Sequence, residues 1–155
     1  MKQIDRSVQV WYEKYANLIK IKDVTGISQL LGRGFKSIPP AGNTFSKMQY
    51  ISEITREFSE YDYPQVTINV VKVREGESKL TAYVEKSLVS YDSKKRRYDS
   101  KILSRETLRT VDGSFQIIEV DTISRELSID GKSLTPKLQE TTDAMCQQCG
   151  NPSRD

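Results

Sequence analysis

The apolar residues of this chain change their spacing once, near residue 64, and that change constrains the fold more than any other feature. Before this point they recur every three or four positions, which is the period of an amphipathic helix. After it they alternate with polar residues, which is the period of a strand with one buried face. Helices followed by consecutive strands predict an α+β domain, with the helices gathered on one face of an antiparallel sheet.

Three helices are expected in the first half. The first carries one apolar stripe, formed by Ile4, Val8, Trp11, Tyr12, Tyr15, Leu18 and Ile19. Asp23 is a suitable N-cap for a second helix, and Gly32 and Gly34 are expected to stop it. A loop rich in proline and glycine then leads to Ser46 and Gln49, whose spacing is that of a capping box at the start of a third helix.

About four to six strands are expected in the second half, forming a curved sheet. The alternation shifts near Val70, which indicates a bulge or burial on both faces. Asp112-Gly113 predicts a type I′ hairpin turn, because both central residues of that turn need positive φ. A second Asp-Gly pair lies at 130–131. We therefore expect a domain over residues 1–131 and a flexible C-terminal tail over 132–155.

Composition narrows the classes of function. The 155 residues are 36% hydrophobic and 29% charged, and a net charge of +3 is too mild to predict nucleic-acid binding by itself. Since no run is long enough to span a membrane and the N-terminus lacks a signal-peptide core, we expect a soluble, cytoplasmic protein with no membrane partner. The alternative is an exported domain whose leader is absent from this sequence. Without histidine, Ser-His-Asp and Cys-His nucleophilic sites are excluded.

Three stretches of the sequence resemble the nuclear transport factor two-like superfamily, especially its SnoaL-like and ketosteroid-isomerase-like branches. They are WYEKYANLIKIKDVTGISQLL, MQYISEI and LRTVDGSFQII. The resemblance implies a cone-shaped α+β fold, related to the cystatin-like folds, with a pocket on the concave face of its sheet. Members range from isomerases and dehydratases to non-catalytic carriers and association domains, so the fold alone does not name a function.

Two carboxylates follow the last apolar stripe. If Phe115 and Ile117 face the helices, period two places Glu119 and Asp121 on the same concave face. A carboxylate buried there would have a raised pKa and could act as a base beside a carbonyl group. Two alternatives remain: the acids lie beyond the edge of the core, or a bulge at Ile117-Ile118 turns both outward.

Aromatic residues are the candidates for a pocket lining. The expected lining comprises Trp11, Tyr15, Tyr50, Phe115 and Ile117, around a small apolar ligand. The alternative is that these side chains, like Tyr12 and Tyr83, simply bury their rings in the core.

The segment from Lys94 to Arg97 contains four consecutive cations, Lys94, Lys95, Arg96 and Arg97, between two tyrosines. These cations could contact phosphates, with ring stacking on bases. Its place at an expected hairpin tip, with acids on both sides, favours a solvated turn, so we do not expect nucleic acid as a partner.

Cys146 and Cys149 form a lone C-x-x-C pair near the end of the chain. Two thiolates supply only half of a tetrahedral zinc site, and neither a second pair nor a histidine completes it. We therefore expect a free dithiol, and no metal or cofactor.

These features predict a non-catalytic, pocket-bearing module that binds a small molecule or another protein. The first alternative is a lyase- or isomerase-type enzyme using Asp121 or Glu119 with a tyrosine hydroxyl. The second is a nucleic-acid-contacting module using the 94–97 segment. The resemblance also implies a homodimer through the exposed face of the sheet. Its patch would be Tyr83, Val89 and Tyr91, provided that Leu80, Ala82 and Val84 face the helices.

Overall fold

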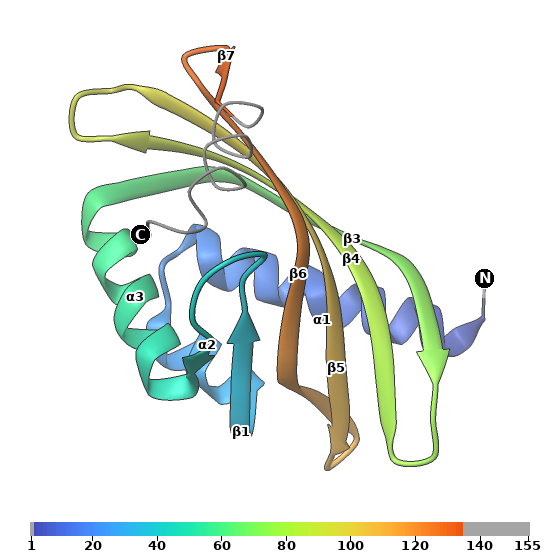
Figure 1. Ribbon diagram of the computed structural model, residues 1–155. Coiled ribbons are helices and arrows are strands. Elements are labelled where there is room, and N and C mark those ends of the chain that lie inside the picture. Colours follow the sequence, from blue (N-terminus) through green and yellow to red (C-terminus); the bar gives the residue numbers. More distant parts are fainter. Residues whose placement is uncertain (1, 135–155) are drawn as a thin grey trace.

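The computed structural model describes residues 2–134. The elements follow the expected order, helices first and long strands afterwards (Figure 1). They are α1 (Gln3–Lys20), α2 (Val24–Leu30), β1 (Leu31–Ile38), β2 (Phe45–Ser46), α3 (Lys47–Glu60), β3 (Tyr61–Glu75), β4 (Lys79–Asp92), β5 (Arg97–Val111), β6 (Ser114–Ile129) and β7 (Lys132–Ser133).

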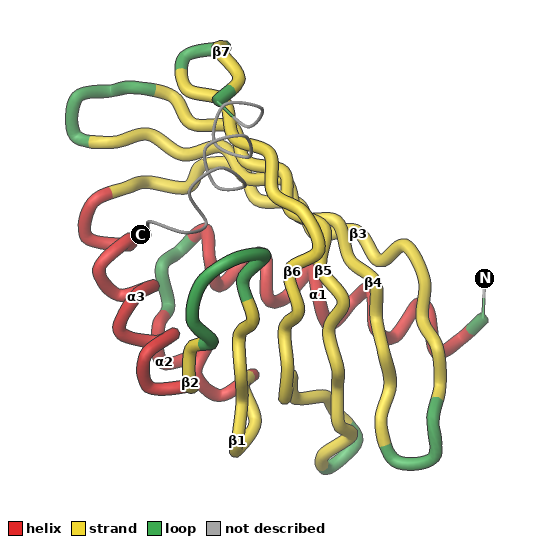
Figure 2. Tube along the Cα trace, viewed as in Figure 1, coloured by secondary structure: helices red, strands yellow, loops and turns green. Residues whose placement is uncertain are grey.

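The strands form one curved sheet in the order β2-β1-β6-β5-β4-β3, and the short β7 pairs with β6. The helices lie on the concave side of this sheet, so the α+β prediction is confirmed (Figure 2). Along the described residues, no helix is both long and apolar enough to cross a membrane.

Strand β1 corrects the prediction for residues 32–38, which were expected to be a helix stop and a loop. It pairs in parallel with β6, so the sheet is mixed rather than wholly antiparallel. Gly32 permits this pairing, because an added Cβ would lie 3.0 Å from the Ile118 side chain. Gly34 has a φ of +78° at the irregular part of the strand. The two glycines therefore mark close packing and a backbone irregularity, and not the end of a structured segment.

The helix starts agree with their local signals. The Asp23 side chain accepts a hydrogen bond of 2.9 Å from the backbone N–H of Gly26, which caps α2. At α3, the Gln49 N–H donates to the Ser46 hydroxyl, and the Ser46 N–H donates to the Gln49 side chain. This is the reciprocal capping box that the sequence predicted.

Bulges bend the sheet into its cone. In β3 the register with β4 shifts between Val70 and Lys72, which confirms the predicted bulge. In β6 the register with β5 shifts twice, leaving Ile118 and Ile123 as the extra residues. Each extra residue locally increases the twist and bend of its strand. The Asp112-Gly113 turn has φ values of 50° and 76°, as a type I′ turn requires.

The exposed edge of β3 is covered by α1. The Gln9 side chain donates to the carbonyl of Ile68 at 3.0 Å and accepts from the N–H of Val70 at 2.7 Å. One amide thus satisfies two backbone groups of an edge strand, beside its bulge. This contact fixes α1 across the concave face, where it packs over the core.

The core lies between α1, α2 and the concave face of the sheet. Leu80, Ala82 and Val84 are at most 8% exposed, so β4 turns this face toward the helices as expected. The predicted domain ends at residue 131, and β7 extends the sheet to Ser133 by pairing with Ser128. Most of the predicted tail, with Cys146 and Cys149, lies outside the described residues.

Candidate functional site

A cavity of about 300 Å³ lies between the helices and the concave face of the sheet. Its walls combine residues from all three described helices with residues from β3, β4, β5 and β6. The apolar part is formed by Ile19, Ile27, Ile54, Phe58, Val66, Ile68, Leu88 and Ile102. A pocket walled by apolar side chains and containing a few fixed polar groups is typical of a small-molecule site.

The polar end of the cavity is an ammonium group held by a buried carboxylate. Lys86 lines the cavity, and its Nζ lies 2.6 Å from Oε2 of Glu106. The Lys86 side chain is 13% exposed, whereas Glu106 is completely buried. Tyr12 donates a hydrogen bond of 2.8 Å to the same carboxylate, and Ser104 donates one of 2.7 Å. Three donors therefore engage Glu106, which is how a buried charge is tolerated.

Electrostatics keep this end of the cavity rich in hydrogen-bond donors. Burial disfavours the charged form of Lys86, but the attraction of Glu106 outweighs it, so the pKa of Lys86 is raised. Burial, reinforced by Glu106, raises the pKa of Tyr12 well above its usual value. Burial and the neighbouring Tyr50 do the same to the pKa of Tyr15. At neutral pH the lysine is an ammonium and both tyrosines are neutral.

Two tyrosines complete the polar end. The hydroxyls of Tyr15 and Tyr50 lie 3.3 Å apart, and both residues line the cavity. The Lys86 ammonium lies 5.9 Å from the centre of the Tyr15 ring. The ammonium and the hydroxyl pair therefore lie close together in the cavity wall.

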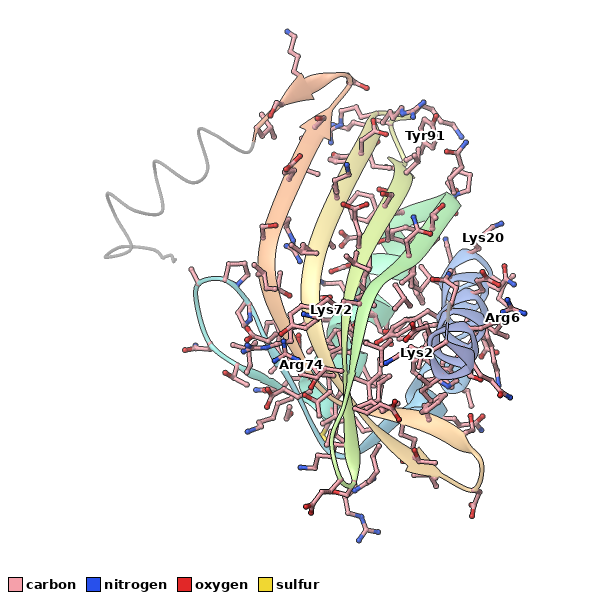
Figure 3. All side chains as sticks on the ribbon, turned by 90° about the vertical axis from the view of Figure 1, so that its right-hand side faces the viewer. Lys2, Arg6, Lys20, Lys72, Arg74 and Tyr91 are labelled. Atoms are coloured by element: carbon pink, nitrogen blue, oxygen red, sulfur yellow. The ribbon has the colours of Figure 1, made fainter. Side chains whose placement is uncertain are left out.

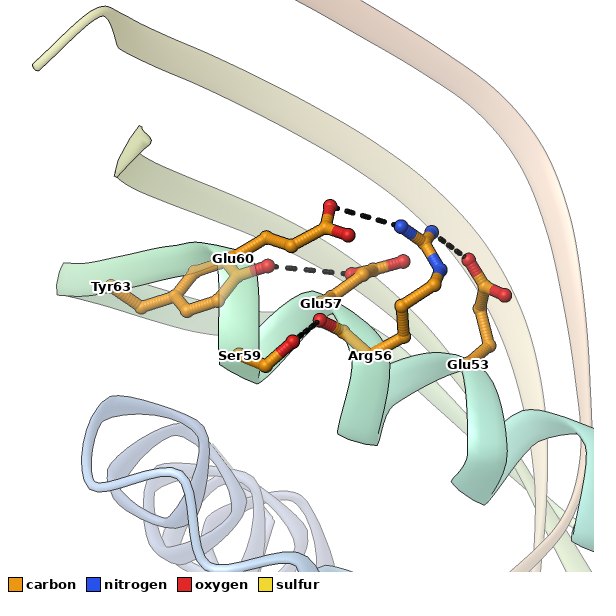
Figure 4. A network of polar contacts seen from close by, with 6 residues as sticks. All are labelled: Glu53, Arg56, Glu57, Ser59, Glu60 and Tyr63. Atoms are coloured by element: carbon orange, nitrogen blue, oxygen red, sulfur yellow. Dashed lines mark hydrogen bonds and ion pairs between the residues drawn. The ribbon is translucent and has the colours of Figure 1, made fainter. Parts of the chain in front are cut away.

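The α3 side of the cavity carries acidic residues (Figure 4). Glu57 lines the cavity and accepts a hydrogen bond of 3.3 Å from the Tyr63 hydroxyl. Burial and the nearby Glu53 raise the pKa of Glu57, although the Tyr63 hydrogen bond opposes the shift. Arg56 is held by ion pairs to Glu53 and Glu60. Glu57 is thus a half-buried carboxylate without an ion-pair partner among the described residues.

The two predicted carboxylates lie on the opposite face of the sheet. The bulge at Ile118 shifts the alternation, so Ile117 and Val120 face the core at 0% and 6% exposure. Glu119 lies 3.9 Å from Lys36 in a weak ion pair. Asp121 pairs with Arg105 at 2.5 Å, with side chains 26% and 50% exposed. Neither acid lines the cavity.

The predicted lining residues separate into three places. Tyr15 and Tyr50 line the cavity. Trp11 and Phe115 instead line a different groove near the β5–β6 turn, with their ring centres 6.3 Å apart. Ile117 is fully buried in the core.

The 94–97 segment forms a tight turn organised by Asp92. This carboxylate accepts from the backbone N–H groups of Lys94 and Arg96, from the Arg96 guanidinium and from the Tyr98 hydroxyl. Desolvation acts against the charge, yet these hydrogen bonds lower the pKa of Asp92 to about 2. Arg97 pairs with Asp99. Among the described residues, Lys94 and Lys95 form no ion pair, which leaves two of the four cations available.

The sequence contains a signal for the polar end of the cavity in the alternation of β4. Lys86 falls within the alternating stripe of Leu80, Ala82, Val84 and Leu88, so a cation occupies an inward position. Glu106 lies opposite Ala82 across the β4–β5 ladder, on the same buried face. Within residues 2–134, no group of three or more acidic or thiol side chains is placed to hold a metal ion.

Comparisons with known proteins support the architecture. No family model matches the sequence, and no curated protein matches it significantly. Among solved structures, a conserved protein from Planctomyces limnophilus is 10% identical, with a TM-score of 0.69, covering 79% of this chain and 100% of its own. Aln2 from a Streptomyces species is 10% identical at a TM-score of 0.65, covering 79% and 90%. An NTF2-like protein from Cytophaga hutchinsonii is 17% identical at 0.60, covering 79% and 98%.

The element order, the curved sheet and these similarities define a cone-shaped α+β protein with a pocket on its concave face. Its fold is that of the nuclear transport factor two-like superfamily, as the sequence resemblance implied. At these identities the similarity establishes the fold alone.

Proposed function

We propose that the cavity binds a small, neutral, amphipathic molecule that presents an acceptor oxygen to Lys86. The observation that carries this proposal is the ammonium of Lys86, placed beside a pair of tyrosine hydroxyls in a cavity whose lining is mostly apolar. Buried polar groups in such a position favour a ligand that satisfies them.

The hydrogen-bond inventory defines the chemistry of that end. A lysine ammonium has three protons, and Glu106 engages one of them at 2.6 Å. The Tyr15 and Tyr50 hydroxyls share one proton between them, which leaves the second hydroxyl proton available. A carbonyl or ether oxygen would accept from these donors, and the ammonium itself can only donate.

Charge favours a neutral ligand over an anion. Glu106 already neutralises Lys86. The cavity also contains Glu53 and Glu57 on its α3 side, against a single further cation, Arg125. An anionic ligand would therefore add a further negative charge to a site whose charges are nearly balanced, at the cost of its own desolvation.

The same inventory supports binding without catalysis at Glu106. Its carboxylate does not line the cavity, and three protein donors engage it. A general base must have a lone pair within reach of the substrate proton. Glu119 and Asp121, the carboxylates suggested by the sequence, pair with cations on the outer face of the sheet.

A neutral fluorescent ketone, 6-propionyl-2-(dimethylamino)naphthalene, tests the proposal. We expect its emission to shift to the blue and to saturate on titration with the protein. Ile54→Trp fills the cavity wall and should weaken binding more than tenfold. Met48→Trp adds the same ring to the same helix at a position that is 82% exposed, and should leave binding unchanged. Equal binding by both variants would place the probe outside the cavity and contradict the proposal.

Tyr50→Phe tests the polar end separately from the cavity volume. Removal of one hydroxyl should weaken binding of the ketone by about three- to tenfold, the value of one net hydrogen bond. The corresponding 6-propyl-2-(dimethylamino)naphthalene, in which a methylene replaces the carbonyl, should bind both proteins equally. If Tyr50→Phe weakens both probes alike, the hydroxyl shapes the cavity and does not recognise the oxygen.

A second candidate function is proton transfer by Glu57. The observation that favours it is a raised pKa on a half-buried carboxylate that lines the cavity and is held by Tyr63. An enzyme of this kind would exchange the hydrogens beside the carbonyl of the same ketone with solvent deuterium, as measured by mass spectrometry. Exchange that is lost in Glu57→Gln would establish this function in place of passive binding.

We also propose that two copies associate through the outer face of the sheet. Tyr83 and Val89 lie on the face opposite the buried Leu80, Ala82 and Val84, and both are half-buried in the isolated chain. Figure 3 shows Lys72 and Arg74 on the side of the sheet away from α1, whereas Tyr91 lies at the end of the sheet near Lys20. Sedimentation velocity should detect a dimer that Tyr83→Glu dissociates. Thr55→Glu, on the exposed side of α3, should leave the dimer intact.

A further inference from the structure

A second concave site lies on the opposite side of α1 from the cavity, and the proposed function does not use it. It is an open groove of about 780 Å³ between α1 and the tip of the β5–β6 hairpin. Its base contains Trp11 and the half-buried ring of Phe115, and its α1 wall carries Arg6, Val10 and Lys14. Ser114 at the hairpin tip contributes to the other wall.

The charge of this groove is entirely positive. Arg6 and Lys14 are its two charged lining residues, and no carboxylate lines it. Among residues 2–134, neither side chain forms an ion pair. Figure 3 shows Arg6 on the outer side of α1, away from the sheet. Two unpaired cations over an apolar floor are complementary to a segment that is acidic and apolar in alternation.

The tryptophan at the base of the groove carries an unsatisfied donor. Trp11 is 5% exposed, and its indole Nε1 is a buried side-chain atom without a hydrogen-bond partner in the described part of the chain. Buried indole N–H groups generally have an acceptor. This N–H is enclosed by the protein, so the Trp11 ring offers the groove an apolar contact and not a hydrogen bond. Next to this ring, Val10 is 58% exposed and offers an apolar contact.

We propose that the groove binds an extended peptide segment with the pattern acidic-x-apolar-x-acidic. Eight residues of helix place Arg6 and Lys14 about 12 Å apart. In an extended chain, residues i, i+2 and i+4 point to one side, and i and i+4 lie about 13 Å apart. The two acidic side chains therefore reach the two cations, while the apolar residue between them covers Val10 and Trp11. Successive phosphates of a nucleic acid would not place an apolar group at this central position.

The test uses the full chain and two labelled peptides of equal composition, GESLSEG and GESSLEG. The second keeps the spacing of the acids but turns the leucine to the opposite side. We expect fluorescence anisotropy to show that GESLSEG binds at least tenfold more tightly. Binding should also change the emission of Trp11, the single tryptophan in the chain. Equal affinity for the two peptides would overturn the proposed pattern.

Three variants assign the contacts. Arg6→Ala and Lys14→Ala should each weaken binding of GESLSEG about fivefold, and Val10→Glu should nearly abolish it. Lys20→Ala removes an exposed cation of the same helix outside the groove, and should have no effect. If Arg6→Ala, Lys14→Ala and Lys20→Ala weaken binding equally, the attraction is a general charge effect, which contradicts a specific site. Displacement of the peptide by a short oligothymidylate would favour a nucleic-acid ligand and contradict the proposal.

Discussion

Two ion pairs lie on opposite faces of the sheet, with similar contact distances but different burial. Glu106 faces the helices and pairs with Lys86 at 2.6 Å, while its neighbour Arg105 faces outward and pairs with Asp121 at 2.5 Å. The inner side chains are 0% and 13% exposed, and the outer ones are 26% and 50% exposed. The two ion pairs therefore have nearly the same contact distance but differ in how far water reaches their charges.

The difference shows why a contact distance does not measure a contribution to stability. The outer pair gains little, because water and salt screen it and the free side chains are already well solvated. The inner pair has lost its water, so its charges depend on each other and on the hydrogen bonds from Tyr12 and Ser104. Only the inner pair is expected to constrain the cavity, because its lysine lines the wall.

The largest expected effect follows from separating the inner pair. Lys86→Met leaves Glu106 buried without its cation, so we expect the free energy of unfolding to fall by about 3–5 kcal/mol. Urea denaturation monitored by circular dichroism measures this change. The double variant Lys86→Met/Glu106→Gln removes both charges and should regain most of the loss. A double variant that is as unstable as the single one would show that packing, and not the unpaired charge, is responsible.

The hydrogen bonds around the inner pair should contribute unequally to the free energy of unfolding. Tyr12→Phe removes a donor to the buried carboxylate, and we expect a loss of about 1.5–3 kcal/mol. Tyr15→Phe removes a longer bond between two neutral hydroxyls, so a loss of at most about 1 kcal/mol is expected. Both rings are buried and both variants delete one oxygen atom, so each serves as a control for the other in urea denaturation. Equal losses would contradict a special role for the Glu106 charge.

The sequence predicts features set by neighbouring residues better than features set by residues far apart in the chain. Signals between residues close in sequence were predicted correctly. Asp23 and the Ser46–Gln49 capping box begin helices, and Asp112-Gly113 forms the predicted turn. The parallel strand β1 was missed because its partner, β6, lies about 80 residues away. No local rule reports that Gly32 is needed for close approach to a distant strand.

The candidate site was harder to predict than the fold for the same reason. One extra residue at Ile118 exchanges the two faces of β6, and the sequence left open whether that bulge exists. Glu119 and Asp121 thus point outward, while Glu106 faces inward on the neighbouring strand. Its partners Tyr12 and Lys86 come from α1 and β4, so only the assembled fold brings these three residues together.

A third carboxylate, Glu57, lies between these extremes and should respond to pH in the opposite sense to a paired acid. Burial and Glu53 raise its pKa above 4.5 in the folded state. Its protonated form thus stabilises the fold below about pH 4.5, and this contribution is lost as the pH rises through the raised pKa. Glu57→Gln should therefore be as stable as the parent protein or slightly more stable at pH 7, with a flatter pH profile above 4.5.

Urea denaturation from pH 4 to pH 8 measures this profile. Glu60→Gln is the matched control, since Glu60 is an exposed acid one turn away that pairs with Arg56 at 3.0 Å. It should retain the fall in stability above pH 4.5 that Glu57→Gln removes. A Glu57→Gln variant that is less stable than the parent at pH 7, yet equal to it at pH 4, would show that the ionised carboxylate is favoured by the fold.

The smallest expected effect concerns the outer pair. In a double-mutant cycle of Arg105→Ala and Asp121→Ala, the coupling should be close to the error of measurement and should disappear in high salt. The cycle needs the same urea experiments as the inner pair, so the two sides of the sheet are compared directly. A strong, salt-insensitive coupling would mean that the outer pair is shielded from water in solution. Because the isolated chain leaves Arg105 half exposed, such a result would require another surface to cover this face, as the proposed dimer would.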